Sequence, residues 1–285
     1  MKTALIAINS KYIHSTLAVW YLSASLSDAG FECDVTEASI NEDTERIYER
    51  VADTEADIYA FSCYIWNIDH VISIAKMIKA QNKDAAIVLG GPEAGYRAED
   101  IFTKYPFVDY VISGEGEMPI VSLVRQLAEC GVAMAGDGIS KKGEIVAPYE
   151  MPCDPPVPYT DKYLSSLCGR IAYIETSRGC PFLCAYCMSS KQHLRFFDID
   201  RAKRDIITLA SSGTKTVKFV DRTFNADRAR AREIFSFIIE KRADGSIPDG
   251  VTFHFEIAGE LVDRETLELL EKVPAGLFQF EIGVQ

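Results

Sequence analysis

One segment indicates the fold of the second half of the chain: Thr176-Ser177-Arg178-Gly179-Cys180-Pro181-Phe182-Leu183-Cys184-Ala185-Tyr186-Cys187. It follows the first of four short apolar stretches that have the pattern of β-strands and alternate with helical patterns. Strands that alternate with helices predict βα units and a parallel sheet. The segment is therefore the loop after the first strand of a βα series, whose expected strands are residues 171–176, 216–220, 251–258 and 278–283.

Three thiols come from this one loop, those of Cys180, Cys184 and Cys187. Three cysteine thiolates can hold three irons of a 4Fe–4S cluster and leave the fourth iron open. A structural zinc ion or a structural cluster normally has four protein ligands, so three ligands favour a reactive site. The alternative is a zinc site or a ferredoxin-like cluster completed by a fourth ligand, for which the candidates are Cys153, Cys168 and His193.

An earlier βα series occupies residues 1–130. Its five strand patterns predict an α/β fold with a doubly wound, flavodoxin-like parallel sheet of five strands. Ligands of such sheets bind beyond the carboxyl ends of the strands. The loops that start near Asn9, Ser62, Gly90 and Ser113 are therefore the candidate binding loops. The expected strands are residues 3–8, 32–37, 58–62, 85–89 and 110–113.

Residues 131–168 interrupt both series. Two glycine-containing turns flank a possible hairpin, and four prolines follow within residues 152–158. We therefore expect three parts: an α/β domain over residues 1–130, a linker with a possible hairpin over 131–168, and a second domain over 169–285. The second series stops directly after its fourth strand, which we interpret as a sequence that ends inside a larger domain.

Composition excludes several classes of protein. The chain has 285 residues, of which 48% are hydrophobic and 25% are charged, enough for two ordinary cores. Its formal net charge of −12 disfavours general nucleic-acid binding. No apolar run reaches the roughly 20 residues of a membrane span, and no cleavable signal is present, so we expect a cytoplasmic protein without membrane partners. In such a chain, eight cysteines indicate metal binding or catalysis rather than disulfides.

The spacing Cys-x3-Cys-x2-Cys, with the aromatic Tyr186 before the third cysteine, resembles the signature of the radical S-adenosylmethionine (SAM) superfamily. The resemblance implies that S-adenosylmethionine chelates the open iron and is cleaved reductively to a 5′-deoxyadenosyl radical. It also implies an electron donor of flavodoxin or ferredoxin type, and a place for Tyr186 among the cofactor-binding residues. The barrel of this family has six strands, so we expect here an incomplete (β/α) partial barrel that binds a cluster without turnover.

Asp221, after the second strand of this series, stands where the resembled family places residues that help to bind the methionine end of S-adenosylmethionine. The carboxyl ends of strands are also where barrel enzymes carry their functional groups. The alternative is a structural carboxylate paired with Lys218 or Arg222.

Two further carboxylates, Glu256 and Glu281, are expected on the inward faces of the third and fourth strands. Residues two apart on a strand point the same way, so they share these faces with His254 and Gln279. We predict that both glutamates contact the cofactor, with structural pairing to a nearby cation as the alternative.

The loops of the first domain resemble those of the cobalamin-binding domain that precedes the barrel in one branch of radical SAM proteins. The resemblance rests on Ser62 after the third strand, Gly90 and Gly91 after the fourth, and Gly114 and Gly116 after the fifth. It implies that these residues surround the nucleotide tail and lower face of cobalamin. Taken singly, a glycine pair after a strand is more often an ordinary turn, since glycine permits tight backbone conformations.

One loop departs from that pattern. Cobalamin domains that ligate cobalt carry Asp-x-His-x-x-Gly after the first strand, whereas this chain has Asn9-Ser10-Lys11-Tyr12-Ile13-His14-Ser15. We therefore expect no histidine ligand from His14. The lower face of cobalamin would be open, or occupied by water or by a side chain such as Tyr12, Tyr64 or Trp66.

The resemblance implies a cobalamin-dependent radical SAM enzyme with a 4Fe–4S cluster, S-adenosylmethionine and cobalamin as cofactors. The expected reaction is methyl transfer to an unactivated carbon of a small-molecule or biosynthetic substrate. Two alternatives are radical chemistry without methyl transfer, such as a rearrangement, and a cobalamin- or cluster-binding module without catalysis.

Overall fold

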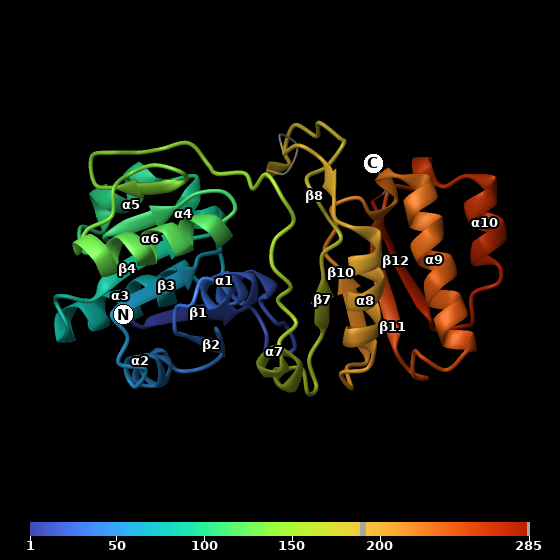
Figure 1. The fold of residues 1–285 in the computed structure, drawn as a ribbon, viewed down its shortest axis with the longest axis horizontal. Helices are drawn as coiled ribbons and strands as arrows, with labels where there is room; N and C mark the ends of the chain where they lie inside the picture. Colours follow the sequence, from blue (N-terminus) through green and yellow to red (C-terminus); the bar gives the residue numbers. More distant parts are fainter. Residues whose placement is uncertain (189–191, 284–285) are drawn as a thin grey trace. The chain divides into compact units, whose positions relative to one another are not determined.

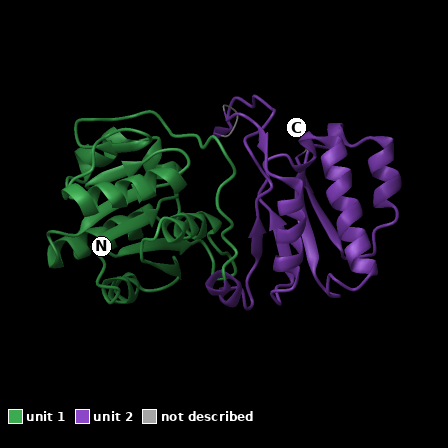
Figure 2. Cartoon of the chain, viewed as in Figure 1, with its two compact units in different colours: residues 1–160 green, residues 161–285 purple. Residues whose placement is uncertain are grey.

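The computed structural model describes residues 1–188 and 192–283. The chain divides into two compact units, residues 1–160 and 161–285 (Figure 1, Figure 2). No helix in the described part combines the length and the apolar character that a membrane span requires.

The first unit is built on a six-stranded sheet with the order β2-β1-β3-β4-β5-β6 (Figure 1). Strands β1 to β5 are parallel, which confirms the predicted doubly wound arrangement, and β6 adds an antiparallel edge next to β5. The strands are β1 (Thr3–Asn9), β2 (Cys33–Ser39), β3 (Ile58–Ser62), β4 (Ala86–Gly90), β5 (Tyr110–Ile112) and β6 (Ile139–Lys141). The helices are α1 (Leu17–Asp28), α2 (Thr44–Ala52), α3 (Ile68–Gln81), α4 (Pro92–Gly95), α5 (Ala98–Lys104) and α6 (Glu117–Cys130).

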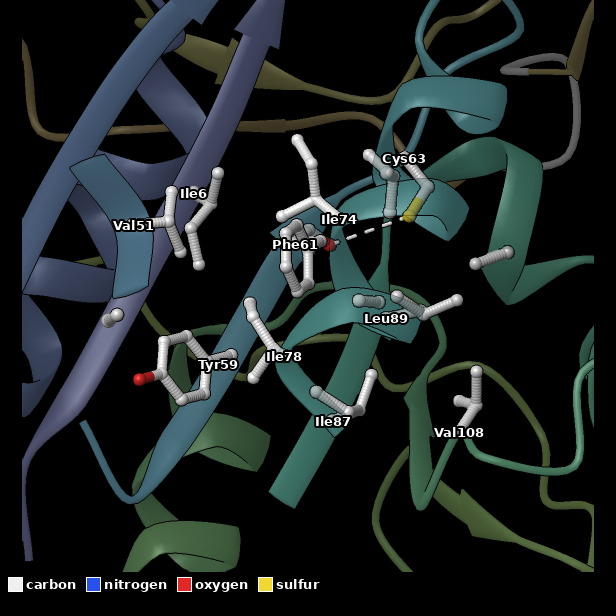
Figure 3. Packing of buried hydrophobic residues seen from close by; sticks show 14 of the residues in the cluster. Ile6, Val51, Tyr59, Phe61, Cys63, Ile74, Ile78, Ile87, Leu89 and Val108 are labelled. Atoms are coloured by element: carbon white, nitrogen blue, oxygen red, sulfur yellow. Dashed lines mark hydrogen bonds between the residues drawn. The ribbon is translucent and has the colours of Figure 1, made fainter. Parts of the chain in front are cut away.

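Alternating side chains of the central strands are buried on both faces of this sheet. On one face, Ile6, Phe61 and Leu89 contribute to an apolar cluster that also contains Val51 of α2 and Ile74 of α3 (Figure 3). On the other face, helices α1 and α6 contact each other. Every residue of β1 is buried, as expected for the interior strand of a parallel sheet covered on both sides.

Strand β6 places part of the expected linker in the first sheet. Lys141 and Glu144 exchange two backbone hydrogen bonds around Lys142-Gly143, where the sequence analysis places a possible hairpin. The compact units are divided between Thr160 and Asp161, whereas the predicted boundaries follow residues 130 and 168. The predicted boundaries of the two domains and the linker stay predictions.

The second unit contains a four-stranded parallel sheet with the order β12-β11-β10-β7 and a separate two-stranded ladder of β8 and β9. All four strands expected in this part of the chain are present. The strands are β7 (Ala172–Ile174), β8 (Ser177–Arg178), β9 (Arg195–Phe196), β10 (Thr216–Phe219), β11 (Thr252–Ile257) and β12 (Phe278–Ile282). The helical segments are α7 (Asp161–Ser166), α8 (Ile199–Ala210), η2 (Phe224–Ala226), α9 (Arg228–Ala243), η3 (Gly259–Leu261) and α10 (Arg264–Leu270).

Aromatic side chains of the strands and of helix α9 form a cluster in the core of the second unit. The rings of Phe219 and Phe255 stack at 4.5 Å, and Phe235 of α9 meets Phe255 edge-on at 5.0 Å. Aromatic pairs in this range contribute roughly 0.5–1.5 kcal/mol beyond the burial of their area. Because alternate strand residues point to opposite faces, the residues between these phenylalanines lie on the other face of the sheet.

Gly114 shows why the first unit needs a glycine after β5. Its φ is +85°, and a Cβ at this position would overlap the backbone of Tyr149. Tyr149 runs beside it as a strap, donating its N–H to the carbonyl of Ser113 and accepting from the N–H of Glu115. The backbone of Tyr149 therefore occupies the space that a side chain at position 114 would need.

Replacing Gly114 by alanine should lower the free energy of unfolding by about 3 kcal/mol, because strain at positive φ adds to overlap with the strap. Gly131 is the matched control: its φ is +72°, but no atom lies within 4 Å of the position that a Cβ would occupy. Gly131→Ala should cost only about 1 kcal/mol. Urea unfolding followed by circular dichroism measures both variants, and equal losses would contradict the role of the strap.

Candidate cofactor sites

The cysteine loop connects strands β8 and β9, which pair in an antiparallel ladder. Ser177 pairs with Phe196 and Arg178 pairs with Arg195, so the two ends of the loop are held together. Gly179 follows with a φ of +86°, and a Cβ there would overlap the carbonyl group of His193. A glycine is therefore required where the chain passes from the ladder into the cysteine segment.

The three cysteines differ in exposure within this loop. Cys180 and Cys184 are half-buried, whereas Cys187 is exposed, and the Cys187 N–H donates to the Cys184 carbonyl at 3.1 Å. Tyr186 is 80% exposed. Three thiols in one loop, whose two ends are paired in the β8–β9 ladder, fit the ligand chemistry of an iron–sulfur cluster. However, no three His, Cys, Asp or Glu side chains within residues 1–188 and 192–283 are arranged to hold a metal ion, so ligation by these cysteines stays a prediction.

Asp221 anchors the chain just before this loop. One carboxylate oxygen accepts hydrogen bonds from the hydroxyls of Thr176 (2.7 Å) and Ser177 (2.5 Å), and the other accepts from the Thr176 N–H (3.1 Å). Burial raises the pKa of Asp221, while these hydrogen bonds act to lower it. Both oxygens are thus engaged by the turn between β7 and β8, rather than by Lys218 or Arg222. This geometry gives Asp221 a positioning role at the start of the cysteine loop, and its contact with S-adenosylmethionine stays a prediction.

Thr223 is a residue that the sequence analysis did not single out. Its hydroxyl oxygen lies 3.4 Å from the sulfur of Cys180, and the residue is only 6% exposed. The one available signal is its position two residues after Asp221. The contact itself depends on how the end of β10 meets the cysteine loop, and no periodicity encodes that.

A group of charged side chains occupies the face of the second sheet opposite the phenylalanines. The Lys218 ammonium lies 3.0 Å from Glu256 Oε1 and 3.3 Å from Glu281 Oε2, and His254 Nε2 lies 3.3 Å from the same Glu281 oxygen. The structure therefore places both predicted glutamates beside Lys218, one of the cations considered as their structural partner. Their contact with S-adenosylmethionine stays a prediction.

The charges in this group influence one another. Burial acts to lower the pKa of Lys218, but the hydrogen bonds and charges of Glu256 and Glu281 outweigh it, so the pKa is raised. Burial and the Lys218 charge lower the pKa of His254, which favours the neutral imidazole. One cation therefore faces two carboxylates, and the group carries an excess of negative charge.

In the first unit, the predicted serine and glycines line up at the carboxyl ends of neighbouring strands. Ser62 of β3 is in register with Gly90 of β4, and Gly90 with Ile112 at the end of β5. Gly114 and Gly116 follow in the next loop. Gly91 has a φ of +91°, and a Cβ there would lie 2.7 Å from the Cys63 carbonyl oxygen, so its close approach is again to the chain itself. The role of these five residues in cobalamin binding stays a prediction.

Asn67 ties the ends of β1 and β3 together, which the sequence analysis missed. Its amide group donates to the carbonyls of Ile8 (3.0 Å) and Ser62 (2.9 Å), and its oxygen accepts from the Tyr64 N–H (2.8 Å). The side chain is 1% exposed. It fixes the loop after Ser62, in which the rings of Tyr64 and Trp66 stack at 4.5 Å.

The loop after β1 is held by Glu37 of β2. The Glu37 carboxylate accepts from the Thr16 N–H at 2.6 Å and from the Asn9 amide at 3.3 Å, and the Thr16 hydroxyl also bonds to Asn9. Large apolar side chains on these candidate binding loops face solvent: Tyr12 is 69% exposed and Ile65 is 80% exposed. An exposed apolar edge beside glycine-rich loops suits a large, flat and partly apolar ligand such as a corrin.

Two family models match the chain, one on each unit. Residues 3–124 match the B12 binding domain, and residues 174–285 match the Radical SAM superfamily. The chain therefore belongs to the proteins that combine these two domains. Specifically, it is a radical SAM protein whose radical SAM domain follows a cobalamin-binding domain.

Similar proteins include several methyltransferases. 2-(S-pantetheinyl)-carbapenam-3-carboxylate methyltransferase of Streptantibioticus cattleyicolor is 28% identical over 224 residues, which are 71% of this chain and 32% of that protein. The cobalamin-dependent radical SAM methyltransferase TokK of Streptomyces tokunonensis is 29% identical over 223 residues, 70% of this chain and 32% of that protein. The chain thus matches about a third of the length of these relatives.

The fold is also found in a solved structure. The radical S-adenosylmethionine methyltransferase TsrM from Kitasatospora setae, with cobalamin and a [4Fe-4S] cluster bound, aligns with a TM-score of 0.77 at 18% identity. The alignment covers 99% of this chain and 58% of that chain. This likeness confirms the predicted α/β architecture with a partial barrel.

Asp221→Asn should lower the free energy of unfolding by about 2–4 kcal/mol, because the amide N–H2 would face hydroxyl and N–H donors in a buried site. Asp198→Asn is the control: Asp198 caps α8 by accepting from the Arg201 N–H, and asparagine caps equally well. Thermal unfolding compares the two variants. An Asp221→Asn protein as stable as Asp198→Asn would show that the anchor is weak.

Proposed function

We propose that this chain is part of a cobalamin-dependent radical SAM methyltransferase that transfers a methyl group to an unactivated carbon of a small-molecule substrate. The observation that carries the proposal is a three-cysteine loop at the carboxyl end of β7, in a chain that also has a B12-binding domain. Methyltransferases among the similar proteins support this reaction.

Cys180, Cys184 and Cys187 would hold a 4Fe–4S cluster. When bound, this group supplies the electron that cleaves S-adenosylmethionine to methionine and a 5′-deoxyadenosyl radical. Asp221 fixes the start of the cysteine loop through Thr176 and Ser177. The negative excess around Lys218 suits the cationic sulfonium and ammonium groups of S-adenosylmethionine.

The first unit would bind cobalamin at the loops that follow β1, β3, β4 and β5. Asn67 and Glu37 hold two of these loops in place, and the exposed aromatic side chains supply apolar contact area. An external one-electron donor of flavodoxin or ferredoxin type and a cytoplasmic location complete the proposal.

Alanine at Cys180, Cys184 or Cys187 should each abolish assembly of an intact cluster, because a thiolate ligand is lost. Anaerobic reconstitution with iron and sulfide, followed by iron analysis and electron paramagnetic resonance (EPR), measures occupancy. Formation of 5′-deoxyadenosine by the full-length wild-type protein tests the enzyme activity.

Three cysteines outside the loop serve as controls. Cys63 is buried, and burial raises the pKa of its thiol to about 12, which keeps it from acting as a thiolate. Cys33 lies 3.3 Å from the Ser23 hydroxyl, and Cys130 ends α6. Substitution of these three should leave cluster content unchanged. Full occupancy in any of the loop variants would refute the assigned ligands.

Cobalamin should bind with its dimethylbenzimidazole tail detached from cobalt and with no histidine in its place. His14→Ala should therefore keep the wild-type cobalamin spectrum, because the loop lacks the ligating spacing and Asn9 is engaged by Glu37 and Thr16. His70→Ala, which removes a hydrogen bond with the Thr44 hydroxyl, is the control. A spectrum that shows loss of a nitrogen ligand in His14→Ala alone would overturn the assignment.

A further inference from the structure

The hydroxyl of Thr223 is directed at the first cysteine of the cluster-binding loop. Its oxygen lies 3.4 Å from Cys180 Sγ, within hydrogen-bonding distance for sulfur. Thr223 is 6% exposed, so water competes little for this contact. Cys180 itself is half-buried.

The chain on both sides of Thr223 is held in place. Two residues earlier, Asp221 accepts three hydrogen bonds from Thr176 and Ser177. On the other side, Phe224 is buried in the aromatic cluster, and Asn225 exchanges two hydrogen bonds of 2.9 Å with the backbone of Ala258. The hydroxyl is thus presented to Cys180 by a segment with little freedom to move.

The direction of this hydrogen bond follows from the chemistry of a ligand. A cysteine that ligates iron is a thiolate without a proton, so the Thr223 hydroxyl has to be the donor. Hydrogen bonds to the sulfurs are among the factors that set the reduction potential of a cluster. A donor at the thiolate stabilises the more negative, reduced state over the oxidised state.

We propose that Thr223 is a positioning residue that donates a hydrogen bond to the Cys180 thiolate and raises the reduction potential of the cluster. The cluster then accepts one electron more readily from an external donor of flavodoxin or ferredoxin type. This inference rests on the proposed function, because it requires a cluster on Cys180.

The test is a redox titration of the anaerobically reconstituted protein, with the reduced cluster followed by EPR. Thr223→Val removes the hydroxyl and keeps the shape, Thr223→Ala removes it without added bulk, and Thr223→Ser keeps the donor. Thr208→Val is the control, because the Thr208 hydroxyl bonds to the Arg204 carbonyl in its own helix α8.

Loss of the donor should make the reduced cluster about tenfold less populated at a fixed potential, a negative shift of about 59 mV for a one-electron couple. Thr223→Ser and Thr208→Val should keep the wild-type midpoint. An unchanged midpoint in Thr223→Val or Thr223→Ala with full iron content would overturn the inference.

Iron content decides the remaining cases. Loss of iron in Thr223→Val and Thr223→Ala but not in Thr223→Ser supports the inference, because the hydroxyl is the feature that serine shares with threonine. Loss of iron in Thr223→Ser as well shows that packing matters instead, and overturns it. A wild-type protein that assembles no cluster would refute the proposed function itself, before any variant is compared.

Discussion

The buried carboxylate of Asp221 is the interaction on which the geometry of the cysteine loop depends. It joins the end of β10 to Thr176 and Ser177, which stand 45 and 44 residues earlier in the sequence, just before the first cysteine. Removing a carboxylate from water is costly unless hydrogen bonds replace the lost hydration. Three hydrogen-bond donors replace that hydration here. Thr223, two residues after Asp221, lies within hydrogen-bonding distance of the Cys180 sulfur and so links the same segment to the cysteine loop.

The two faces of the second sheet carry different side chains: one face is aromatic and the other is charged. Phenylalanines fill the face toward the helices, so the alternate residues gather on the other face as Lys218, His254, Glu256 and Glu281. A lysine shared by two carboxylates is held more firmly than an exposed pair, which contributes only about 0–1 kcal/mol. A ligand on this face meets a preformed charge distribution, whose negative excess favours cations.

In the first unit, the same residues serve the fold and the predicted ligand site. Gly91 and Gly114 have positive φ angles, and the backbones of Cys63 and Tyr149 also pass too close to them for a side chain. Asn67 and Glu37 use their hydrogen bonds to hold loops at the carboxyl ends of the strands. The edge of the sheet is thereby shaped before any ligand arrives, which reduces the cost of ordering loops on binding.

The sequence by itself determined the two βα series, the positions of their nine expected strands and the cysteine loop, because hydrophobic periodicity and ligand spacing are local properties. It also placed Asp221, Glu256 and Glu281 at strand ends. Only the tertiary structure decided what these carboxylates touch: Asp221 meets Thr176 and Ser177, and the two glutamates meet Lys218. It likewise decided that β6 joins the first sheet and that Thr223 reaches Cys180. These partners are distant in sequence, and the register and twist of neighbouring strands bring them together, which no local pattern specifies.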